Sequence, residues 1–385
     1  MIKIGINGFG RIGKSILNQS IVNNKIKVNA INFPGFNIHK IASYINHDSF
    51  HKTQPFNISV LDDNNIEING NKIRLLDNRK PEIGMWEDAK YVFETTGKFL
   101  TNEKALEHGA DYFIMCAPSK DKTPQYLYNG NHLHYKGERV ISNSSCTTNC
   151  IVPLIKILND KYGIEHCNFI TVHAATASQK VLDGPHLKKR TYRSIFNNII
   201  PHTTGASKSA IKILPELDGK IYGASVRVPT SNVSMVDMNV TLKQDLPLSN
   251  IFDLLRNRPE IVVNDDEHLV STDFMTTTNP TIVDSAASMK MGPNNYKFTI
   301  WYDNEWSYSN QAIQLLEHID TMGSILKKEE IRAEHYQRAE QFRESKKGLE
   351  QIDTNDTVLE EEEIRTELYK RAEQFRESKK EVQNA

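Results

Sequence analysis

The stretch IKIGINGFGRIGKSILNQSIVNNKIKVNAINF, residues 2–33, decides the fold. Residues 2–8 form a short apolar run that ends in a glycine, the pattern of a buried strand before a tight turn. Residues 11–22 carry apolar side chains at helical spacing, and residues 27–33 are predicted to form a second strand. Strand, glycine turn, helix and strand make a βαβ unit, in which the two strands run parallel.

The turn between the first strand and the helix has the spacing G-x-G-x-x-G. Gly8 permits a tight turn, Gly10 lets a pyrophosphate approach the backbone, and Gly13 lets the helix pack closely on the strand. The N-terminus of the helix offers free N–H groups and partial positive charge to a phosphate. The alternative is a glycine-rich turn without a ligand, but the position between strand and helix favours a dinucleotide site.

The carboxylate that would hold the adenosine ribose hydroxyls is missing. It is expected about 20 residues after the glycines, at the end of the second strand, where the sequence has Asn32, Phe33 and Pro34. Asp48 lies too far along the chain to replace it. We therefore assign Asn32 to the cofactor site, and NAD and NADP both stay open.

The alternation of strands and helices continues to about residue 146. Strands are predicted at 91–96, 112–118 and 139–143, with a helix at 101–109 between two of them. This pattern predicts an α/β fold, with a Rossmann-type, doubly wound parallel sheet in residues 1–146.

Residues 147–308 have a different texture, with a long helix followed by alternating apolar and polar runs. They predict an α+β catalytic domain with a mainly antiparallel sheet and helices on one face. A helix at 309–323, stopped by Gly323, is expected to complete the first domain.

Residues 327–385 form a charged C-terminal part, with 13 Lys/Arg and 16 Asp/Glu. The segment 329–347 recurs at 362–380 with three differences. In each copy four residues form a narrow apolar helical stripe, which in the first copy consists of Ile331, Tyr336, Ala339 and Phe342. We expect a repeated helical extension that forms a hairpin, docks on the body or binds a protein partner, the alternative being a solvated tail.

The composition excludes several classes of partner. The 385 residues include 47 Lys/Arg and 48 Asp/Glu, which gives a formal net charge of −1. This balance of charges gives no indication of a nucleic-acid partner. No run of about 18 apolar residues exists, and the first strand leaves no room for a targeting peptide, so we expect a cytoplasmic protein without a membrane span. Four cysteines without common zinc spacing predict neither a disulfide framework nor a metal site.

The segment SNSSCTTNC, residues 142–150, places Cys146 among polar side chains just before an apolar helix. Free cysteines usually lie in apolar cores. Near a helix N-terminus the dipole and free N–H groups stabilise a thiolate, and polar neighbours keep the sulfur accessible. We therefore predict that Cys146 is a nucleophile that is ionised near neutral pH, while Cys150 is expected to be a packed small residue.

Over about residues 1–325 the sequence resembles the phosphorylating glyceraldehyde-3-phosphate dehydrogenase family. The resemblance rests on the order and spacing of INGFGRIG, SNSSCTTNC, TVHAATASQ, NIIPHTTGASK, LPELDGK, VRVPTSNVSMVD and WYDNEWSYSN. It implies the glycolytic conversion of D-glyceraldehyde 3-phosphate, phosphate and NAD⁺ to 1,3-bisphosphoglycerate and NADH. Cys146 would carry a thioester intermediate, and His173 would be its base.

The resemblance also implies two anion sites, to which hydroxyl groups and arginine forks are suited. Thr176 and Arg227 match the site for the phosphate of the substrate. The residues that match the site for the attacking phosphate are Ser145, Thr147, Thr204 and Gly205. An arginine from the preceding loop, either Arg190 or Arg193, is expected to join them. Each Ser or Thr taken alone is more often a cap or turn residue.

Further positions match the dinucleotide site of the family. Asn304 is implied to orient the nicotinamide carboxamide, and Tyr308 to pack beside that ring, with a core aromatic as the alternative. The other matching positions are Arg11, Ile12, Thr96, Gly97 and Ser119.

The resemblance implies a homotetramer, in which the loop 183–201 reaches a neighbouring subunit's cofactor. Phe33 and Lys52 depart from the family pattern, and 327–385 has no counterpart in it. Two rival functions stay open. One is erythrose-4-phosphate dehydrogenase, which shares the cysteine and histidine but releases a free acid. The other is an interaction scaffold that binds through the repeated tail.

Overall fold

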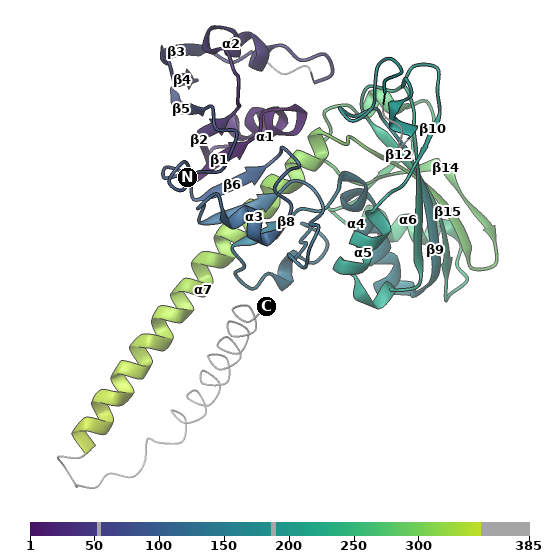
Figure 1. Cartoon of the computed structure of the whole chain (residues 1–385). Coiled ribbons are helices and arrows are strands. Elements are labelled where there is room, and N and C mark those ends of the chain that lie inside the picture. Colours follow the sequence, from purple (N-terminus) through teal and green to yellow (C-terminus); the bar gives the residue numbers. More distant parts are fainter. Residues whose placement is uncertain (52–54, 186–189, 348–385) are drawn as a thin grey trace. The chain divides into compact units, whose positions relative to one another are not determined.

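The computed structural model describes residues 1–51, 55–185 and 190–347. These residues form two compact units. The first comprises Met1–Leu133 with Arg139–Leu316 and contains both β-sheets, and the second comprises His134–Glu138 with the chain from Glu317 onward. Figure 1 shows the course of the chain.

The first sheet has eight strands in the order β3-β4-β5-β2-β1-β6-β7-β8. From β5 to β8 neighbouring strands are parallel, so the predicted doubly wound sheet is confirmed. Because β1 lies between β2 and β6, the loop after β1 is at the topological switch point, where such sheets bind ligands. The elements are β1 Ile2–Asn7, α1 Arg11–Ile21, β2 Ile26–Asn32, α2 Ile38–Asn46, β3 Ile58–Asp62, β4 Asn65–Ile68, β5 Asn71–Leu76, β6 Tyr91–Glu94, α3 Asn102–Leu106, β7 Tyr112–Met115, the short 3₁₀ helix η1 His132–His134 and β8 Val140–Ser142.

An antiparallel ribbon of β3, β4 and β5 extends one edge of this sheet and was not predicted. Its second turn is Asn69-Gly70, with φ of 49° and 83°. Positive φ at both central residues is the geometry of the tight hairpin turns that Asn-Gly favours. The local signal was therefore present in the sequence, where it lies inside a polar stretch.

The second sheet has seven strands in the order β10-β11-β9-β12-β15-β14-β13. Only the pairs β11·β9 and β13·β14 are parallel, so the predicted mainly antiparallel sheet is confirmed. The elements are α4 Cys146–Tyr162, β9 Ile164–His173, η2 Arg190–Tyr192, β10 Ile200–His202, α5 Ala206–Ile213, η3 Pro215–Leu217, β11 Ile221–Arg227, β12 Ser234–Leu242, α6 Leu248–Arg256, β13 Val262–Asn264, η4 Ser271–Phe274, β14 Ile282–Gly292 and β15 Asn295–Tyr302.

The core of this second sheet lies on one face, beneath α4, α5 and α6 (Figure 1). Alternate residues of β12, from Ser234 to Leu242, are buried, as the two-residue period of a strand requires. On α4, Ile151, Leu154, Ile155 and Leu158 are fully buried against this face. The position of Cys146 is thus fixed by a helix that is anchored along its length.

Helix α7 runs from Trp306 to Lys347, so the predicted stop at Gly323 is wrong. A glycine that ends a helix adopts a left-handed φ, and Gly323 is not among the glycines with positive φ. The residues after it, Ser-Ile-Leu-Lys-Lys-Glu-Glu, mostly have good helix propensity and carry the helix onward. The first copy of the repeat, 329–347, is helical as expected. The second copy, 362–380, lies outside the described residues.

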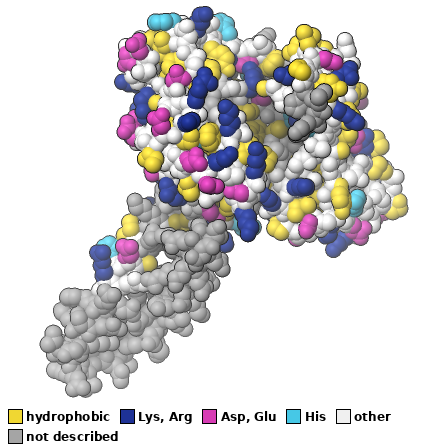
Figure 2. Space-filling view, viewed as in Figure 1, with side chains coloured by type: hydrophobic (Ala, Val, Ile, Leu, Met, Phe, Trp, Pro, Cys, Tyr) yellow, Lys and Arg dark blue, Asp and Glu magenta, His cyan; other side chains and the backbone are white. Residues whose placement is uncertain are grey.

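The surface carries both signs of charge. Figure 2 shows basic and acidic side chains interspersed on the visible face, in keeping with the net charge of −1. In the described part of the chain, no helix has both the length and the apolar character needed to cross a bilayer.

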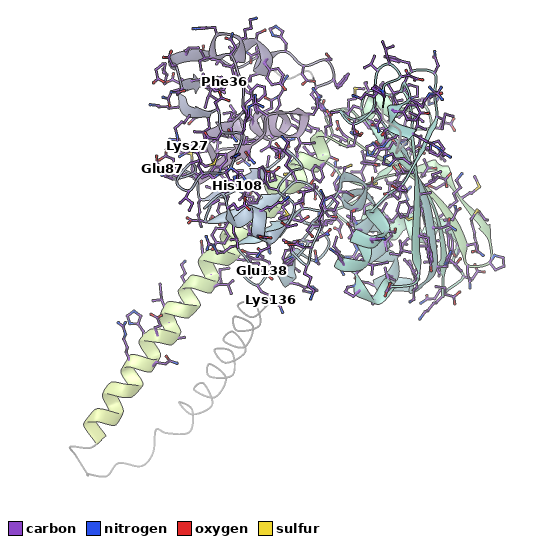
Figure 3. The ribbon with its side chains drawn as sticks, viewed as in Figure 1. Lys27, Phe36, Glu87, His108, Lys136 and Glu138 are labelled. Carbon is purple, nitrogen blue, oxygen red and sulfur yellow. The ribbon has the colours of Figure 1, made fainter. Side chains whose placement is uncertain are left out.

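His108, labelled in Figure 3, is buried between the rings of Phe99 and Phe113. Neither of its ring nitrogens has a hydrogen-bond partner among the described residues. Burial therefore lowers the pKa of His108 to about 4, because the imidazolium form would lose its hydration.

Candidate active site

Cys146 is the first residue of α4 and follows a tightly held loop. Ser145 caps the helix, its hydroxyl accepting from the Thr148 N–H at 3.1 Å. Ser144 has a φ of 57°, uncommon for a residue other than glycine. The Tyr308 hydroxyl of α7 donates to the Ser144 carbonyl at 3.0 Å. The loop thus aims the Cys146 side chain by capping, backbone strain and a hydrogen bond from α7.

His173, the last residue of β9, lies against the sulfur. Its Nε2 is 3.4 Å from Cys146 Sγ, so the structure brings together the two residues predicted to carry the chemistry. On the other side of the ring, Nδ1 is 2.8 Å from the Ala174 carbonyl oxygen. When Nδ1–H donates to that oxygen, Nε2 holds a lone pair toward the thiol, which is the tautomer that a proton acceptor needs.

Arg227 ends β11 directly opposite His173, because the two residues pair in register. Its Nη1 is 2.5 Å from His173 Nδ1 and 3.1 Å from the Ala174 carbonyl oxygen. Arginine can only donate, so a hydrogen bond from Nη1 to Nδ1 belongs to the tautomer with the proton on Nε2. In the tautomer with the proton on Nδ1, which leaves Nε2 free to accept, Arg227 donates to the Ala174 oxygen alone. Burial, and then the charge of Arg227, lower the pKa of His173 to about 3. His173 is therefore neutral, and able to accept a proton, throughout the physiological pH range.

The Cys146 thiol differs from the prediction of a thiolate near neutral pH. Burial raises the pKa of Cys146 above its ordinary value, while the Arg227 charge and hydrogen bonds from Thr147 lower it in part. The prediction counted the helix N-terminus but could not include the desolvation of a half-buried sulfur. In this structure the pair is a neutral thiol beside a neutral imidazole.

Five of the eight predicted phosphate-site residues fall into two groups. Ser145, Thr147 and Arg227 lie at the cysteine–histidine pair, with Thr147 Oγ1 2.9 Å from the Tyr302 hydroxyl. Thr204 and Gly205 form the N-terminus of α5, where Thr204 Oγ1 accepts from the Ala206 N–H at 3.1 Å.

Thr176 and the two loop arginines have other surroundings. Thr176 Oγ1 donates to Gln179 Oε1 at 2.8 Å. Arg193 pairs with Asp183 at 2.9 Å, whereas Arg190 begins η2 and is exposed. Arg190 is thus the one of the two without an ion pair among the described residues.

The glycine turn has the geometry of a dinucleotide cradle. Gly8 has a φ of 92°, and a Cβ on Gly13 would lie 2.3 Å from the Gly8 carbonyl oxygen, so both positions require glycine. A Cβ on Gly10 would meet nothing within 4 Å. Open space above the backbone at the start of α1 is what a pyrophosphate needs, so these residues fit a dinucleotide. Thr96 closes the other side, with Cγ2 2.6 Å from a Cβ placed on Gly8.

The residues around the adenosine end differ from a carboxylate site. The Asn32 amide donates to Asn7 Oδ1 at 2.8 Å and to the Asn78 carbonyl at 2.9 Å. Phe33 stacks on Tyr44 with ring centroids 5.7 Å apart. Asp48 pairs with Arg11 at 2.5 Å.

The other cofactor candidates are spread over several loops. Arg11 forms a second ion pair with Glu305 at 2.6 Å, and Ile12 is half-buried beside it in α1. Gly97 has a φ of 70°, and the buried Ser119 hydroxyl donates to the Thr123 carbonyl at 2.9 Å.

Asn304 and Ser234 form a contact that the sequence did not suggest. Asn304 follows β15 and is buried, with its Oδ1 2.8 Å from the Ser234 hydroxyl. Ser234 lies within the quoted segment VRVPTSNVSMVD, but no periodicity or spacing singled it out. The signal is spatial, because β12 lies between β9 and β15.

Fold and site together define a class of protein. A parallel sheet with a glycine turn at its switch point is joined to a second domain in which a cysteine that can attack a carbonyl contacts a histidine that can accept its proton. This combination is typical of two-domain, dinucleotide-dependent oxidoreductases. The family model described as "Glyceraldehyde 3-phosphate dehydrogenase, NAD binding domain" matches residues 2–102, and that described as the C-terminal domain matches residues 145–304. The chain belongs to the glyceraldehyde-3-phosphate dehydrogenase family, and it is an NAD-dependent dehydrogenase.

Similar proteins match more than four-fifths of the chain. The glyceraldehyde-3-phosphate dehydrogenase of Bacteroides fragilis (strain YCH46) is 44% identical over 328 residues, 82% of this chain and 98% of the relative. A cytosolic enzyme of that name from Chlamydomonas reinhardtii is 41% identical over 337 residues, 84% and 98% of the two chains. A chloroplastic one from Arabidopsis thaliana is 40% identical over 329 residues, 82% and 78%.

Proposed function

We propose that this protein oxidises D-glyceraldehyde 3-phosphate with NAD⁺ and phosphate to give 1,3-bisphosphoglycerate and NADH. The observation that carries the proposal is the 3.4 Å contact between Cys146 Sγ and His173 Nε2 at the start of α4, beside the Arg227 cation. A nucleophile and a base in contact, next to an anion-binding group, are what thioester chemistry on a phosphorylated aldehyde requires.

The reaction begins when the Cys146 sulfur bonds to the aldehyde carbon. The thiol proton passes to His173 Nε2 and from there to the new alkoxide, giving a hemithioacetal. The imidazole starts neutral, so its Nε2 can accept this proton. When bound, NAD⁺ supplies the acceptor for the hydride.

Oxidation of the hemithioacetal then needs His173 a second time. Its Nε2 takes the hydroxyl proton as the hydride leaves the carbon, and a thioester on Cys146 results. Phosphate attacks the thioester carbon, the C–S bond breaks, and the leaving sulfur takes the proton from His173 Nε2, which regenerates the thiol and the neutral imidazole. One proton is released to solvent per turnover, so atoms and electrons balance.

We propose that Arg227 and Thr176 hold the phosphate of the substrate, and that the N-termini of α4 and α5 hold the attacking phosphate with Arg190 or Arg193. Ser145, Thr147, Thr204 and Gly205 lie at those two helix N-termini, where free N–H groups attract anions. Asn304, Tyr308, Asn32 and the glycine turn would hold NAD.

The test is a steady-state assay of NAD⁺ reduction with glyceraldehyde 3-phosphate, with and without phosphate. We expect phosphate-dependent turnover, and its loss in Cys146→Ser and His173→Asn. Turnover of erythrose 4-phosphate that does not need phosphate would instead support the rival dehydrogenase. NADP⁺, run in parallel, tests the absence of an acid at Phe33.

We also propose a homotetramer. Among the described residues, the loop region 177–200 exposes the large apolar side chains of Val181, Leu182, Phe196 and Ile199, each more than half exposed. Such a group favours cover by a second copy of the chain. Light scattering coupled to gel filtration measures the mass, and we expect Phe196→Asp to lower it.

The remaining assignments are proposals of domain organisation and location. We propose that residues 1–146 with the start of α7 bind the dinucleotide, that 147–308 carry the catalytic groups, and that 327–385 form a helical extension with its own partner. Deletion of 327–385 tests the extension: unchanged kinetics with a lost partner supports it. Cytosolic and chloroplastic relatives match similarly, so fractionation of the full-length chain tests the cytoplasmic location that we propose.

A further inference from the structure

We propose that Ser234 is a positioning residue that fixes the Asn304 amide for the nicotinamide and couples it to the residues behind the His173 ring. This inference rests on the proposed function, in which Asn304 binds the carboxamide of NAD. It concerns a hydroxyl group that contacts neither the sulfur nor the imidazole.

The hydrogen bonds of Ser234 define a direction. Its Oγ accepts from the Ala174 N–H at 3.0 Å and lies 2.8 Å from Asn304 Oδ1. A backbone N–H can only donate, so the hydroxyl uses an oxygen lone pair there and has its own proton free for the Asn304 carbonyl oxygen. The Asn304 Nδ2 group is thereby turned away from Ser234. In the described part of the chain, no hydrogen-bond acceptor contacts Nδ2, so it can donate to a ligand.

The same hydroxyl reaches the catalytic pair through Ala174. The Ala174 carbonyl oxygen receives His173 Nδ1 at 2.8 Å and Arg227 Nη1 at 3.1 Å. The Ser234 hydroxyl accepts a hydrogen bond from the Ala174 N–H. It therefore fixes the backbone whose carbonyl oxygen contacts the imidazole of His173. The Ser234 hydroxyl therefore helps to orient both the Asn304 amide and the His173 ring.

The sheet topology explains why residue 234 can do this. Strand β12 lies between β9, which ends at His173, and β15, which leads to Asn304. Ser234 is the first residue of β12 and pairs in register with Tyr302, two residues before Asn304. Ser234 therefore lies between the end of β9, which carries His173, and the end of β15, which leads to Asn304.

The backbone before Ser234 is strained. Val233 is buried and has a φ of 62°, and a β-branched residue rarely adopts this left-handed conformation. On its other side the Asn232 amide nitrogen lies 2.9 Å from His51 Nε2. Strain that the surrounding structure maintains is a mark of functional sites. Here it turns the Ser234 hydroxyl into the space between Ala174 and Asn304.

The test measures dinucleotide binding by calorimetry, without aldehyde, for NAD⁺ and for its 3-acetylpyridine analogue, which lacks the carboxamide NH₂. In the wild type, Asn304 Nδ2 donates to a carbonyl oxygen that both ligands have. In Ser234→Ala the amide can rotate and accept from the NH₂ of NAD⁺, but the analogue offers no such donor. We expect Ser234→Ala to weaken the analogue about 3- to 10-fold more than NAD⁺, the worth of one net hydrogen bond.

Three variants control this measurement. Ser288→Ala removes another buried hydroxyl that bridges neighbouring strands, where it accepts from the Thr299 N–H at 3.1 Å, and it should leave both affinities unchanged. Ser234→Thr retains the hydroxyl and should restore the wild-type ratio. In an Asn304→Ala background, Ser234→Ala should have no further effect on the ratio.

Equal weakening of both dinucleotides, an effect matched by Ser288→Ala, or additivity with Asn304→Ala would overturn the inference. Wild-type protein that binds neither dinucleotide would also overturn it. The proposed function fails differently: binding and its ratio would stay intact while no aldehyde is oxidised. Cys146→Ser separates the two, since it should abolish turnover and leave the ratio unchanged.

Discussion

Replacing Arg227 by glutamine should slow the alkylation of Cys146 by iodoacetamide. Arg227 Nη1 lies 2.5 Å from His173 Nδ1, and His173 Nε2 lies 3.4 Å from the sulfur, so the cation is within about 8 Å of the sulfur once the width of the ring is included. Two unit charges about 8 Å apart at an effective dielectric constant of about 20 interact by about 2 kcal/mol. That is about 1.5 units of pKa, or about 30-fold in thiolate population. Partial exposure of Arg227 reduces this, so we expect a rate about 5- to 30-fold lower.

The assay follows loss of the free thiol at pH 8 in the absence of cofactor. Iodoacetamide is uncharged, so a lost attraction for the reagent does not contribute. Burial is the larger cause of the low pKa of His173, which keeps the imidazole neutral at pH 8 in both proteins. Because the pKa of Cys146 is raised, the wild-type rate should still be rising with pH through this range.

Two control variants bracket the result. Arg227→Lys keeps the charge and should stay near the wild-type rate, and Cys146→Ser reports the background from the other cysteines. A rate for Arg227→Gln within twofold of wild type, or a faster one, would refute the idea that this cation acts on the thiol.

Three further predictions concern stability and binding. For His108, the pKa of about 4 in the folded protein lies below the unfolded value of about 6.5, so stability present above pH 6.5 is lost between pH 6.5 and 4, by up to about 3 kcal/mol. The urea midpoint of His108→Phe should therefore fall less than that of the wild type between pH 7.5 and pH 5. An equal fall in both proteins would count against this pKa of His108. Gly13→Ala should lower the melting temperature, because its Cβ would lie 2.3 Å from a carbonyl oxygen. Gly10→Ala should leave the melting temperature unchanged and weaken NAD binding, because its Cβ would meet nothing in the protein. Thermal-shift measurements with and without NAD⁺ check both variants. Gly323→Ala should stabilise α7 by about 1 kcal/mol, seen as increased helicity or a higher melting temperature, and a decrease would mean that the helix ends at that glycine after all.

Much of the fold followed from periodicity and turn chemistry, because these act over a few residues. The βαβ unit at residues 2–32 was predictable since its glycines, strand and helix are contiguous. The ribbon of β3, β4 and β5 was missed because its strands are short and about half of their residues are polar. The end of α7 was wrongly predicted because a glycine ends a helix only when it adopts a left-handed φ and the residues after it do not continue the helix.

The active site divides in the same way. Cys146 could be proposed from its neighbours alone, since its loop and its helix are adjacent in sequence. The desolvation that raises its pKa arises from burial in the folded site and is absent from any local sequence pattern. The role of Ser234 could not be predicted from the sequence either, because its hydrogen-bond partners Ala174 and Asn304 are 60 and 70 residues away along the chain.

The nucleophile follows the last strand of the first sheet, while its proton acceptor ends a strand of the second. During synthesis the sulfur of Cys146 is therefore made before the imidazole that serves it, and the amide of Asn304 emerges later still. A ribosome-bound or truncated chain that stops short of residue 304 lacks the Asn304 amide that contacts Ser234. The three side chains therefore come together only after nearly all strands of both sheets have been made.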